Sequence, residues 1–326
     1  MSRPPHPTPP LRGLLLAAYG LVACGLVACG LVACGAPAAR RAAPSASPDR
    51  PGPEAVEPRS ASTAPAGVDA HMHLGRPEDR GEPATGAEAV AALDEAGLAR
   101  GVVLSPGYRR PPACDARPCP AQRAYTEEAN DWTLREAADA AGRLLPFCGV
   151  PWMASWSSEE AARCEAAGAR GLKLHQVEAG VSLRDEAAAE ALGRLLDAAA
   201  AAELPVLIHV RMDDASEVRA FFAIAAAHPD ARVIAAHQIA PSFALLPEAP
   251  ENVWIEVSGL PHAAPSAGDA FVPTWRAFGL DRVLLGSDFP SLSPRAHLAM
   301  LEAYPLSDEE RRRIVVDNPR RLFGAP

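Results

Sequence analysis

The sequence predicts a (β/α)8 TIM barrel behind an N-terminal segment of different composition. From residue 67 onward, short apolar runs alternate with alanine-rich helical patterns, which indicates parallel strands covered by helices. Eight such runs fall between residues 67 and 288, close to the roughly 250 residues of a typical barrel. Ligand-type residues end the first, fifth, sixth and eighth runs. Only a closed barrel brings those four ends to one mouth, whereas the alternative, an open doubly wound sheet, would keep them apart.

The expected elements follow from the two periodicities of the chain. Neither a Gly-x-Gly-x-x-Gly after the first run nor a P-loop is present, which further disfavours a nucleotide-binding open sheet. Ser157 with Glu160, and Ser307 with Glu310, resemble capping boxes. The expected strands are 67–73, 101–105, 145–150, 170–175, 205–210, 232–237, 252–258 and 282–288. The expected helices include 86–98, 122–141, 158–167, 183–202 and 216–227.

Composition excludes some classes of partner. The chain has 326 residues, 48% of them hydrophobic, and a formal net charge of -9. That length is ample for one large domain with a buried core. No basic stripe interleaved with aromatic residues occurs, so nucleic acid is not an expected partner. A small-molecule substrate is expected instead, and the oligomeric state stays open.

The first 23 residues read as an export signal. Arg3 and Arg12 give a positive start, and an apolar stretch runs from Leu14 to Ala23. It is too short for a permanent membrane span and is typical of a secretory signal. The unit at 21–25 (LVACG) recurs at 26–30 and 31–35, and each copy resembles a bacterial lipobox. The alternative is an ordinary cleaved signal with a slipped repeat.

The lipobox reading predicts a protein anchored by lipid to a bacterial membrane, on its periplasmic or cell-surface side. Cys24 is the expected lipidation site because it lies nearest the apolar stretch, with Cys29 and Cys34 as alternatives. Residues 24–66 hold the repeat and an Ala-, Pro- and Ser-rich linker without apolar periodicity. Residues 67–326 form the expected catalytic domain.

Four further cysteines lie in this domain. In an exported protein, Cys114 and Cys119 can close a small disulfide loop in their proline-rich surroundings. Cys148 ends an expected strand and Cys164 lies in an expected helix. Both are interpreted as small buried apolar side chains.

The segment 68–73 (VDAHMH) is the strongest chemical signal. A strand turns alternate side chains to one face, so His71 and His73 point the same way. Three later apolar runs end in His209, His237 and Asp288. Any one of these residues alone is more often structural. Together, at one barrel mouth, imidazole and carboxylate groups are the ligands expected for zinc or another borderline divalent ion.

These motifs resemble the metal-dependent amidohydrolase superfamily, in particular the amidohydrolase-related (amidohydrolase 2) branch that also contains decarboxylases. The resemblance covers about 67–325. It is carried by 69–73 (DAHMH), by 171–175 (GLKLH), by the three strand-end residues and by 318–324 (NPRRLFG). It implies that one divalent metal, zinc or else manganese, is held by His71, His73, His209 and Asp288.

The same resemblance implies roles for other residues. His237 would orient water or polarise the substrate, and Asp288 would also move protons as a catalytic group. Lys173 and His175 share a strand face. They would contact a substrate carboxylate or carbonyl, bind a second metal, or form an ion pair inside the barrel. Arg211 follows the fifth strand and is a candidate for an anionic substrate group.

Three supporting residues also carry expectations. Asp69 lies on the same strand face as the two histidines and is expected to fix their orientation. Ser258 ends the seventh strand and is expected to hydrogen-bond near the site, and Asn130 is interpreted as helix surface.

Three functions follow, in order of preference. The first is a hydrolase that uses metal-activated water on an amide, lactone or ester bond of a small molecule. The second is a metal-dependent decarboxylase of the same branch. The third is a non-catalytic lipoprotein that binds a metal or a small ligand.

Overall fold

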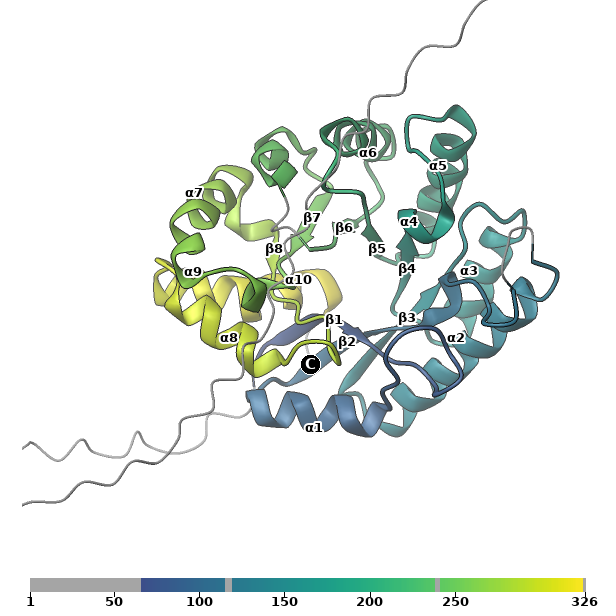
Figure 1. Cartoon of the computed structure of the whole chain (residues 1–326), viewed down its shortest axis with the longest axis horizontal. Coiled ribbons are helices and arrows are strands. Elements are labelled where there is room, and N and C mark those ends of the chain that lie inside the picture. Colours follow the sequence, from purple (N-terminus) through teal and green to yellow (C-terminus); the bar gives the residue numbers. More distant parts are fainter. Residues whose placement is uncertain (1–65, 115–118, 238–240, 325–326) are drawn as a thin grey trace, which may run out of the picture. The chain divides into compact units, whose positions relative to one another are not determined.

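Eight parallel strands form the centre of the domain, as predicted. The structure is a computed structural model that describes residues 66–114, 119–237 and 241–324. Neighbouring strands pair in the order β1 to β8 (Figure 1). The predicted signal peptide and linker, with Cys24, Cys29 and Cys34, lie outside the described residues. The strands are β1 (Val68–His73), β2 (Arg100–Leu104), β3 (Leu144–Gly149), β4 (Gly171–His175), β5 (Val206–His209), β6 (Val233–Ala235), β7 (Val253–Glu256) and β8 (Val283–Leu284).

The first and last strands meet, which closes the sheet. The Ala70 amide donates to the Leu285 carbonyl at 2.8 Å, and Met72 forms a parallel bridge with Phe289. The Asp288 amide donates to the His71 carbonyl at 2.7 Å. These bonds continue past the short β8 and confirm the barrel in place of an open sheet.

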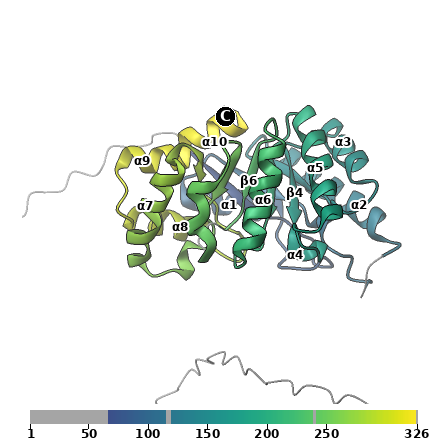
Figure 2. The same ribbon diagram turned by 90° about the horizontal axis from the view of Figure 1, so that it is seen from above.

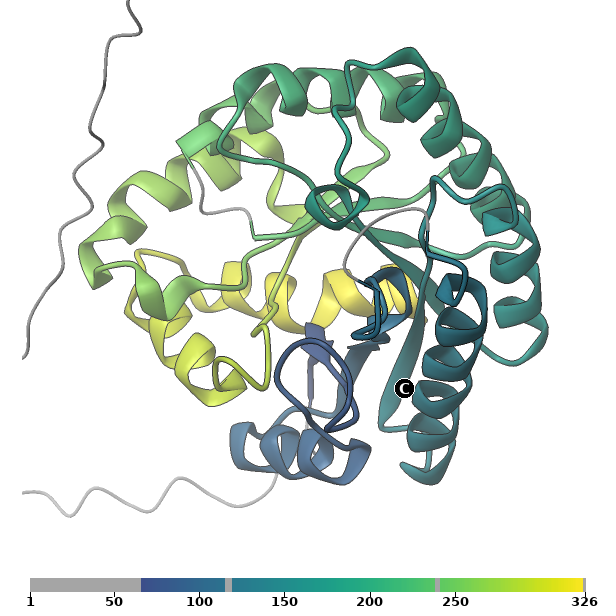
Figure 3. The same ribbon diagram turned by 45° about the vertical axis from the view of Figure 1, so that its right-hand side comes forward.

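Helices surround the strands (Figures 1 and 3). They are α1 (Gly86–Ala96), α2 (Gln122–Asp139), α3 (Ser157–Ala166), α4 (Gln176–Ala179), α5 (Glu186–Ala201), α6 (Ala215–Ala227), α7 (Gly268–Phe278), α8 (Pro294–Ala303), α9 (Asp308–Arg312) and α10 (Asn318–Phe323). A 3₁₀ segment, Pro241–Glu248, stands between β6 and β7 where a barrel usually has a helix. Among the described residues, no helix has both the length and the apolarity to cross a bilayer.

Some boundaries differ from the prediction. β6 ends at Ala235 and β8 at Leu284, so His237 and Asp288 lie beyond their strands instead of closing them. The capping box at Ser307 and Glu310 is confirmed. The one at Ser157 is wrong, because α3 begins after Trp156 and has no side-chain cap.

The final helix closes one end of the barrel. Leu322 and Phe323 of α10 belong to the apolar cluster inside the barrel, and the Phe323 ring meets the Phe147 ring edge-on at 6.0 Å. In Figure 2, α10 lies at one end of the domain and α4, which follows β4, at the other. The barrel interior is therefore filled where its strands begin, and the expected site lies where they end.

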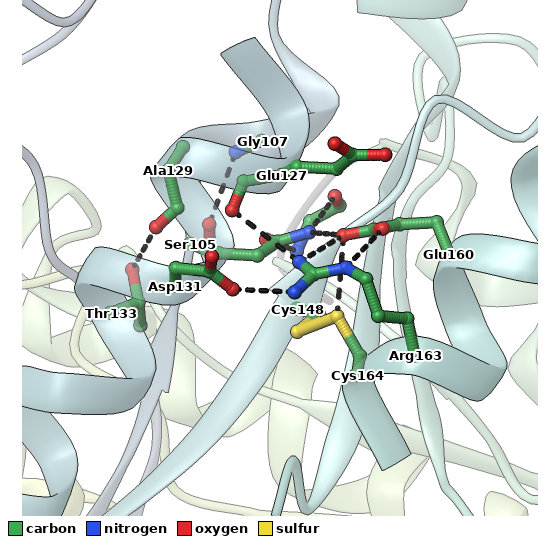
Figure 4. Close-up of a disulfide and its surroundings, with 12 residues drawn as sticks. Ser105, Gly107, Glu127, Ala129, Asp131, Thr133, Cys148, Glu160, Arg163 and Cys164 are labelled. Atoms are coloured by element: carbon green, nitrogen blue, oxygen red, sulfur yellow. Dashed lines mark hydrogen bonds and ion pairs between the residues drawn. A yellow bond between two sulfur atoms is a disulfide. The ribbon is translucent and has the colours of Figure 1, made fainter. Parts of the chain in front are cut away.

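Two disulfides join the four cysteines. Cys114 pairs with Cys119, as predicted, with an S–S distance of 1.97 Å. The expectation that Cys148 and Cys164 are unpaired was wrong, because they pair across β3 and α3 at 2.15 Å (Figure 4). Burial was correctly expected for both residues. Packing of α3 on β3 is what brings together two thiols that are 16 residues apart in the chain.

Asn130 corrects another expectation. It was interpreted as helix surface, but its side chain is fully buried between α2 and β3. Its amide nitrogen donates to the Gly149 carbonyl at 3.1 Å and to Glu160 at 2.7 Å, and its oxygen accepts from the Gly149 amide at 2.8 Å. A buried amide must find such partners, so Asn130 joins β3 and α3 to its own helix.

Candidate metal centre

His71 and His73 share one face of β1, as the alternation predicts. Their Nε2 atoms lie 3.0 Å apart. Met72, between them, is buried on the opposite side in the layer between strands and helices. Two imidazole nitrogens this close need a shared proton or cation between them, because two lone pairs repel at that distance.

Asp288 completes the closest group of ligand atoms. Its Oδ1 lies 3.1 Å from His73 Nε2 and 3.4 Å from His71 Nε2. The ligand atoms of the three residues all lie within 4.8 Å of one another. Burial would raise the pKa of Asp288, but the hydrogen bond from His73 and the nearby imidazoles hold it below its ordinary value. The Asp288 carboxylate is therefore ionised at neutral pH.

The backbone of two site residues is unusual. Asp288 has a φ of 67° and His237 a φ of 57°. Residues other than glycine rarely adopt this left-handed conformation, and they do so mostly where function requires it. The left-handed turn directs each side chain inward from a position beyond its strand, which the sequence pattern could not reveal.

Glu256 is the functional residue that sequence reasoning missed. It is fully buried at the end of β7, and its Oε1 lies 2.7 Å from His71 Nδ1. A carboxylate on Nδ1 turns Nε2 toward the centre and makes the imidazole a better ligand. A Cβ on Gly286 would lie 2.3 Å from Glu256 Oε2, so only glycine at this position leaves room. The available signal was an acidic residue closing the apolar run 253–256.

His237 is held from the same side. Its backbone amide donates to Glu256 Oε1 at 2.8 Å, and its Nδ1 lies 2.7 Å from Ser258 Oγ. The expected hydrogen bond of Ser258 near the site is thereby confirmed. With Nδ1 occupied, His237 presents Nε2, and its ring centroid lies 4.7 Å from that of His71. His71, His237 and Glu256 form a second group whose ligand atoms lie within 4.8 Å of one another.

His209 and His175 stand together on the neighbouring strands. Their residues pair in register, and their rings stack at 4.1 Å with an interplanar angle of 6°. His209 also meets His237 edge-on at 4.9 Å. Neither of the two close groups includes His209, so it faces the cluster from across the mouth. His175 Nδ1 accepts from the Glu178 amide at 3.3 Å.

Lys173 is buried beneath these rings. Its side chain is 1% exposed, and its ammonium group has no hydrogen-bond partner among the described residues. It lies 5.9 Å from the ring centroid of Tyr108. Burial lowers its pKa to about 8. Within the described ranges it forms no ion pair, so it retains its charge for a group that enters the site.

Burial keeps the site imidazoles neutral. It lowers the pKa of His209 to about 4 and that of His237 to about 3, and it lowers those of His71, His73 and His175 as well. A metal binds the unprotonated imidazole. At neutral pH these imidazoles are therefore not in the imidazolium form, which could not bind a metal.

Asp69 acts on the backbone rather than on the imidazoles. Its Oδ1 accepts from the His71 amide at 3.0 Å and from the Ser287 amide at 2.9 Å. Burial raises its pKa to about 7. Asp69 thus joins two backbone segments: the end of β1, which carries the histidines, and the turn that carries Asp288. The expectation that Asp69 orients the imidazoles is thereby refined, because it acts through the backbone.

A cavity of about 720 Å³ opens beside His209 and His237. Two segments form its walls, one within 176–182 and the other 209–213, which contains Arg211. Glu217 of α6 joins these walls, because it accepts from Gln176 Nε2 at 2.6 Å and from the Leu183 amide at 2.7 Å. Gln176 Oε1 in turn accepts from the Arg211 amide at 2.8 Å. One buried carboxylate therefore sets the shape of the cavity.

Comparison with known proteins identifies the family of this chain. Residues 68–325 match the sequence profile of the family described as Amidohydrolase. The chain belongs to that family. Its members include hydrolases and decarboxylases. No curated protein sequence matches the chain at a significant level.

Solved structures share the fold at low sequence identity. A 2,6-dihydroxybenzoate decarboxylase from Rhizobium has 18% identity and a TM-score of 0.61, covering 79% of this chain and 98% of its own. A dihydroxybenzoic acid decarboxylase from Polaromonas sp. JS666, with bound manganese and the inhibitor 2-nitroresorcinol, has 15% identity and a TM-score of 0.61, covering 79% and 96%. A probable 2-pyrone-4,6-dicarboxylic acid hydrolase from Acinetobacter baumannii has 18% identity and a TM-score of 0.58, covering 80% and 100%.

Proposed function

We propose that this protein is a metal-dependent decarboxylase of small hydroxylated aromatic acids. The observation that carries the proposal is the pairing of a three-residue ligand cluster with a buried, unpaired cation. The ligand atoms of His71, His73 and Asp288 lie within 4.8 Å of one another, and the Lys173 ammonium group has no hydrogen-bond partner among the described residues. Such a site suits a substrate that carries a carboxylate next to a second oxygen atom, one that can bind the metal. The decarboxylases among the structural neighbours support this choice over the hydrolase expected from the sequence.

The ligand cluster fits one divalent metal. His71 and His73 present neutral Nε2 atoms, Asp288 is ionised, and Glu256 holds the outer nitrogen of His71. We assign these three residues as ligands, with His209 as the fourth. Zinc and manganese both suit imidazole and carboxylate ligands. When bound, the metal supplies positive charge that attracts and polarises the substrate's oxygen atoms.

The chain's own residues perform the remaining steps. Lys173, with Arg211 at the cavity wall, holds the anionic groups of the substrate. The bond between the ring carbon and the carboxylate then breaks, carbon dioxide leaves, and the ring carbon takes up a proton. The ionised Asp288 first accepts the proton of the substrate's hydroxyl group and then delivers that proton to the ring carbon. The product phenolate then takes up a proton from solvent, which reaches the site beside the 29% exposed side chain of Asp288. His237, fixed by Ser258, orients the substrate.

A hydrolase is the second candidate. The cavity of about 720 Å³ gives water access to His237 and His209, and an ionised Asp288 can accept a proton from that water. A lactone, ester or amide carbon would then be attacked. The Acinetobacter neighbour supports this candidate. A non-catalytic role in metal or ligand binding is the third.

One experiment separates the three functions. The full-length protein, loaded with Mn²⁺ or Zn²⁺, is incubated with 2,6-dihydroxybenzoate, with 5-carboxyvanillate and with 2-pyrone-4,6-dicarboxylate in ¹⁸O-labelled water. We expect release of carbon dioxide without label in the organic product. Label in the product would establish the hydrolase. Full activity and full metal content in both His209→Ala and Asp288→Asn would contradict the site assignment, and inertness of the loaded protein would favour the binding role.

We also propose that the chain is exported and lipid-anchored through Cys24, from the lipobox-like repeat at 21–35. Mass spectrometry of the membrane fraction tests this proposal. A diacylglyceryl group on the cysteine is expected, and it should move to Cys29 or Cys34, or vanish, in Cys24→Ser. Recovery of an unmodified soluble chain would contradict the anchor.

A further inference from the structure

His297 is a buried imidazole that lies outside the metal centre. It belongs to α8, its side chain is fully buried, and both of its ring nitrogens have backbone partners. Nε2 lies 2.9 Å from the Gly259 amide nitrogen, and Nδ1 lies 3.0 Å from the Ser293 carbonyl oxygen. The ring therefore joins the start of α8 to the turn that follows β7.

These two partners fix the tautomer of the His297 ring. A backbone amide only donates, so Nε2 is the unprotonated nitrogen that accepts from Gly259. The ring proton then lies on Nδ1, where the Ser293 carbonyl accepts it. Burial favours this neutral form, because it lowers the pKa of His297. Both contacts therefore require one and the same neutral tautomer.

The turn that His297 holds carries Ser258. Gly259 follows Ser258 and has a φ of 91°, in the left-handed region that favours glycine. The Ser258 amide donates to Glu256 Oε2 at 2.8 Å, and its hydroxyl donates to Glu256 Oε1 at 3.1 Å. Ser258 is thus held on one side by Glu256 and on the other by the bond between Gly259 and His297.

We propose that His297 is a positioning residue that acts through Ser258 and fixes the tautomer in which His237 faces the substrate. The Ser258 hydroxyl gives its proton to Glu256 Oε1, so its lone pair accepts the Nδ1 proton of His237 across 2.7 Å. The Nε2 lone pair of His237 is then the one that faces the site.

Loss of the Nε2 acceptor leaves the buried Gly259 amide without its partner. Such a group costs free energy until it finds another acceptor, so the turn moves and carries Ser258 with it. The Nδ1 atom of His237 then loses its fixed acceptor, and both neutral tautomers become accessible. Because His237 is proposed to orient the substrate, this role of His297 rests on the proposed function.

Two amide variants separate the two bonds of the ring. The amide of His297→Gln reaches the position of Nε2 and can accept from Gly259, whereas that of His297→Asn reaches only the position of Nδ1 and can donate to Ser293. Each variant keeps one bond, loses the other and leaves a smaller side chain. His228→Asn is the control, because it removes an imidazole that pairs with Asp197 at the far end of α6.

The first measurement is the tautomer of His237, which requires no activity. Two-bond ¹H–¹⁵N spectra of the full-length, Zn²⁺-loaded protein with ¹⁵N-labelled histidine distinguish the two neutral forms, and a His237→Gln spectrum assigns the signal. We expect the Nδ1–H form in the parent, in His228→Asn and in His297→Gln, and a mixture of both forms in His297→Asn.

The second measurement is kcat/KM for release of carbon dioxide. It should be at least ~10-fold lower in His297→Asn than in His297→Gln, at equal zinc content, because a small displacement of an orienting group is costly. An inactive parent would count against the proposed function alone, since the spectra still decide the role of His297.

The same tautomer of His237 in every protein, or the same mixture in both amide variants, would overturn the proposal. Equal kcat/KM in the two variants of an active enzyme would also overturn it. If His297→Asn does not fold, His297→Gln decides alone: the parent tautomer supports the proposal, and a mixture overturns it.

Discussion

The two ends of this barrel use polar side chains in opposite ways. Where the strands end, His71, His73 and Asp288 point their polar atoms at one another, and Lys173 has no partner. Where the strands begin, several arginines donate to backbone carbonyls. Arg282, for example, donates to the carbonyls of Pro250 at 2.8 Å and Val253 at 2.9 Å.

Barrel geometry explains this difference. Helices of a barrel run against the strands, so their C-terminal ends, with unsatisfied carbonyls and partial negative charge, gather where the strands begin. Arg143 donates to the carbonyls of Leu98 and Ala99, just after α1, and Arg282 donates to that of Phe278 at the end of α7. Several arginines at the closed end therefore satisfy backbone carbonyls, whereas the polar atoms at the open end face one another and a cavity. Substitutions at the two ends should consequently have different effects.

The largest effect is expected for Asp288→Asn at the open end. Loss of the ionised ligand and proton carrier should lower activity by ~10³-fold, measured as initial rate with the metal-loaded protein. The unfolding midpoint of the metal-free protein should fall only modestly, through loss of the contacts with His73 and the other imidazoles that hold the pKa of Asp288 low. Asp230→Asn, at an exposed position, is the control. A large loss of stability in Asp288→Asn would show that the open end also supports the fold.

Lys173→Met should stabilise the metal-free protein at neutral pH. The folded state holds the pKa of Lys173 near 8 instead of 10.5, so between these values the unfolded chain binds a proton that the folded chain does not. The free energy of unfolding is therefore lowered by its full amount below pH 8, and this loss disappears as the pH rises to 10.5. Methionine removes this reduction, which amounts to about 3 kcal/mol at pH 7.

Urea unfolding of both proteins at pH 7 and at pH 10.5 measures this effect. The advantage of Lys173→Met should disappear at the higher pH. If the variant is instead less stable at pH 7, then a partner of Lys173 offsets the cost of burying its ammonium group. The two ends of the barrel would then differ less in how their polar groups are satisfied.

Glu256→Gln should weaken metal binding without abolishing it. The amide no longer draws the Nδ1 proton of His71, so metal affinity should fall ~10–100-fold. Competition with a chromophoric chelator measures the change, with Glu302→Gln at an exposed position of α8 as the control. Unchanged affinity in Glu256→Gln would mean that His71 is oriented by packing alone.

The smallest effect is expected for Arg282→Ala at the closed end. Removal of its donors leaves carbonyls of Pro250, Val253 and Phe278 without these partners, and the free energy of unfolding should fall by about 2 kcal/mol. Metal content and specific activity of the folded protein should stay unchanged. A loss of specific activity in Arg282→Ala would show that the closed end also affects the site.

The sequence was sufficient for the barrel and for the gathering of its histidines. Strand and helix periods are local properties, and the ends of parallel strands in a closed barrel meet by geometry. His71 and His73 followed from strand alternation alone. The order of strands and helices also predicted at which end of the barrel His209, His237 and Asp288 lie.

The missed features depend on tertiary contacts. Glu256 resembled any acidic residue after a strand until His71 was found 2.7 Å away. The pairing of Cys148 with Cys164 required the packing of α3 on β3, and burial of Asn130 required the same neighbours. The left-handed turns at His237 and Asp288 leave no periodic signal.

The joining of β1 to the segment after β8 has a consequence for biogenesis. His71 and His73 are synthesised early, whereas Asp288 and the Ser287 amide that Asp69 binds arrive near the end of the chain. A chain whose last strand has not yet joined its first has His71 and His73 in place without the carboxylate of Asp288. If these residues hold the proposed metal, its uptake is tied to completion of folding, and a truncated molecule is expected to be inactive.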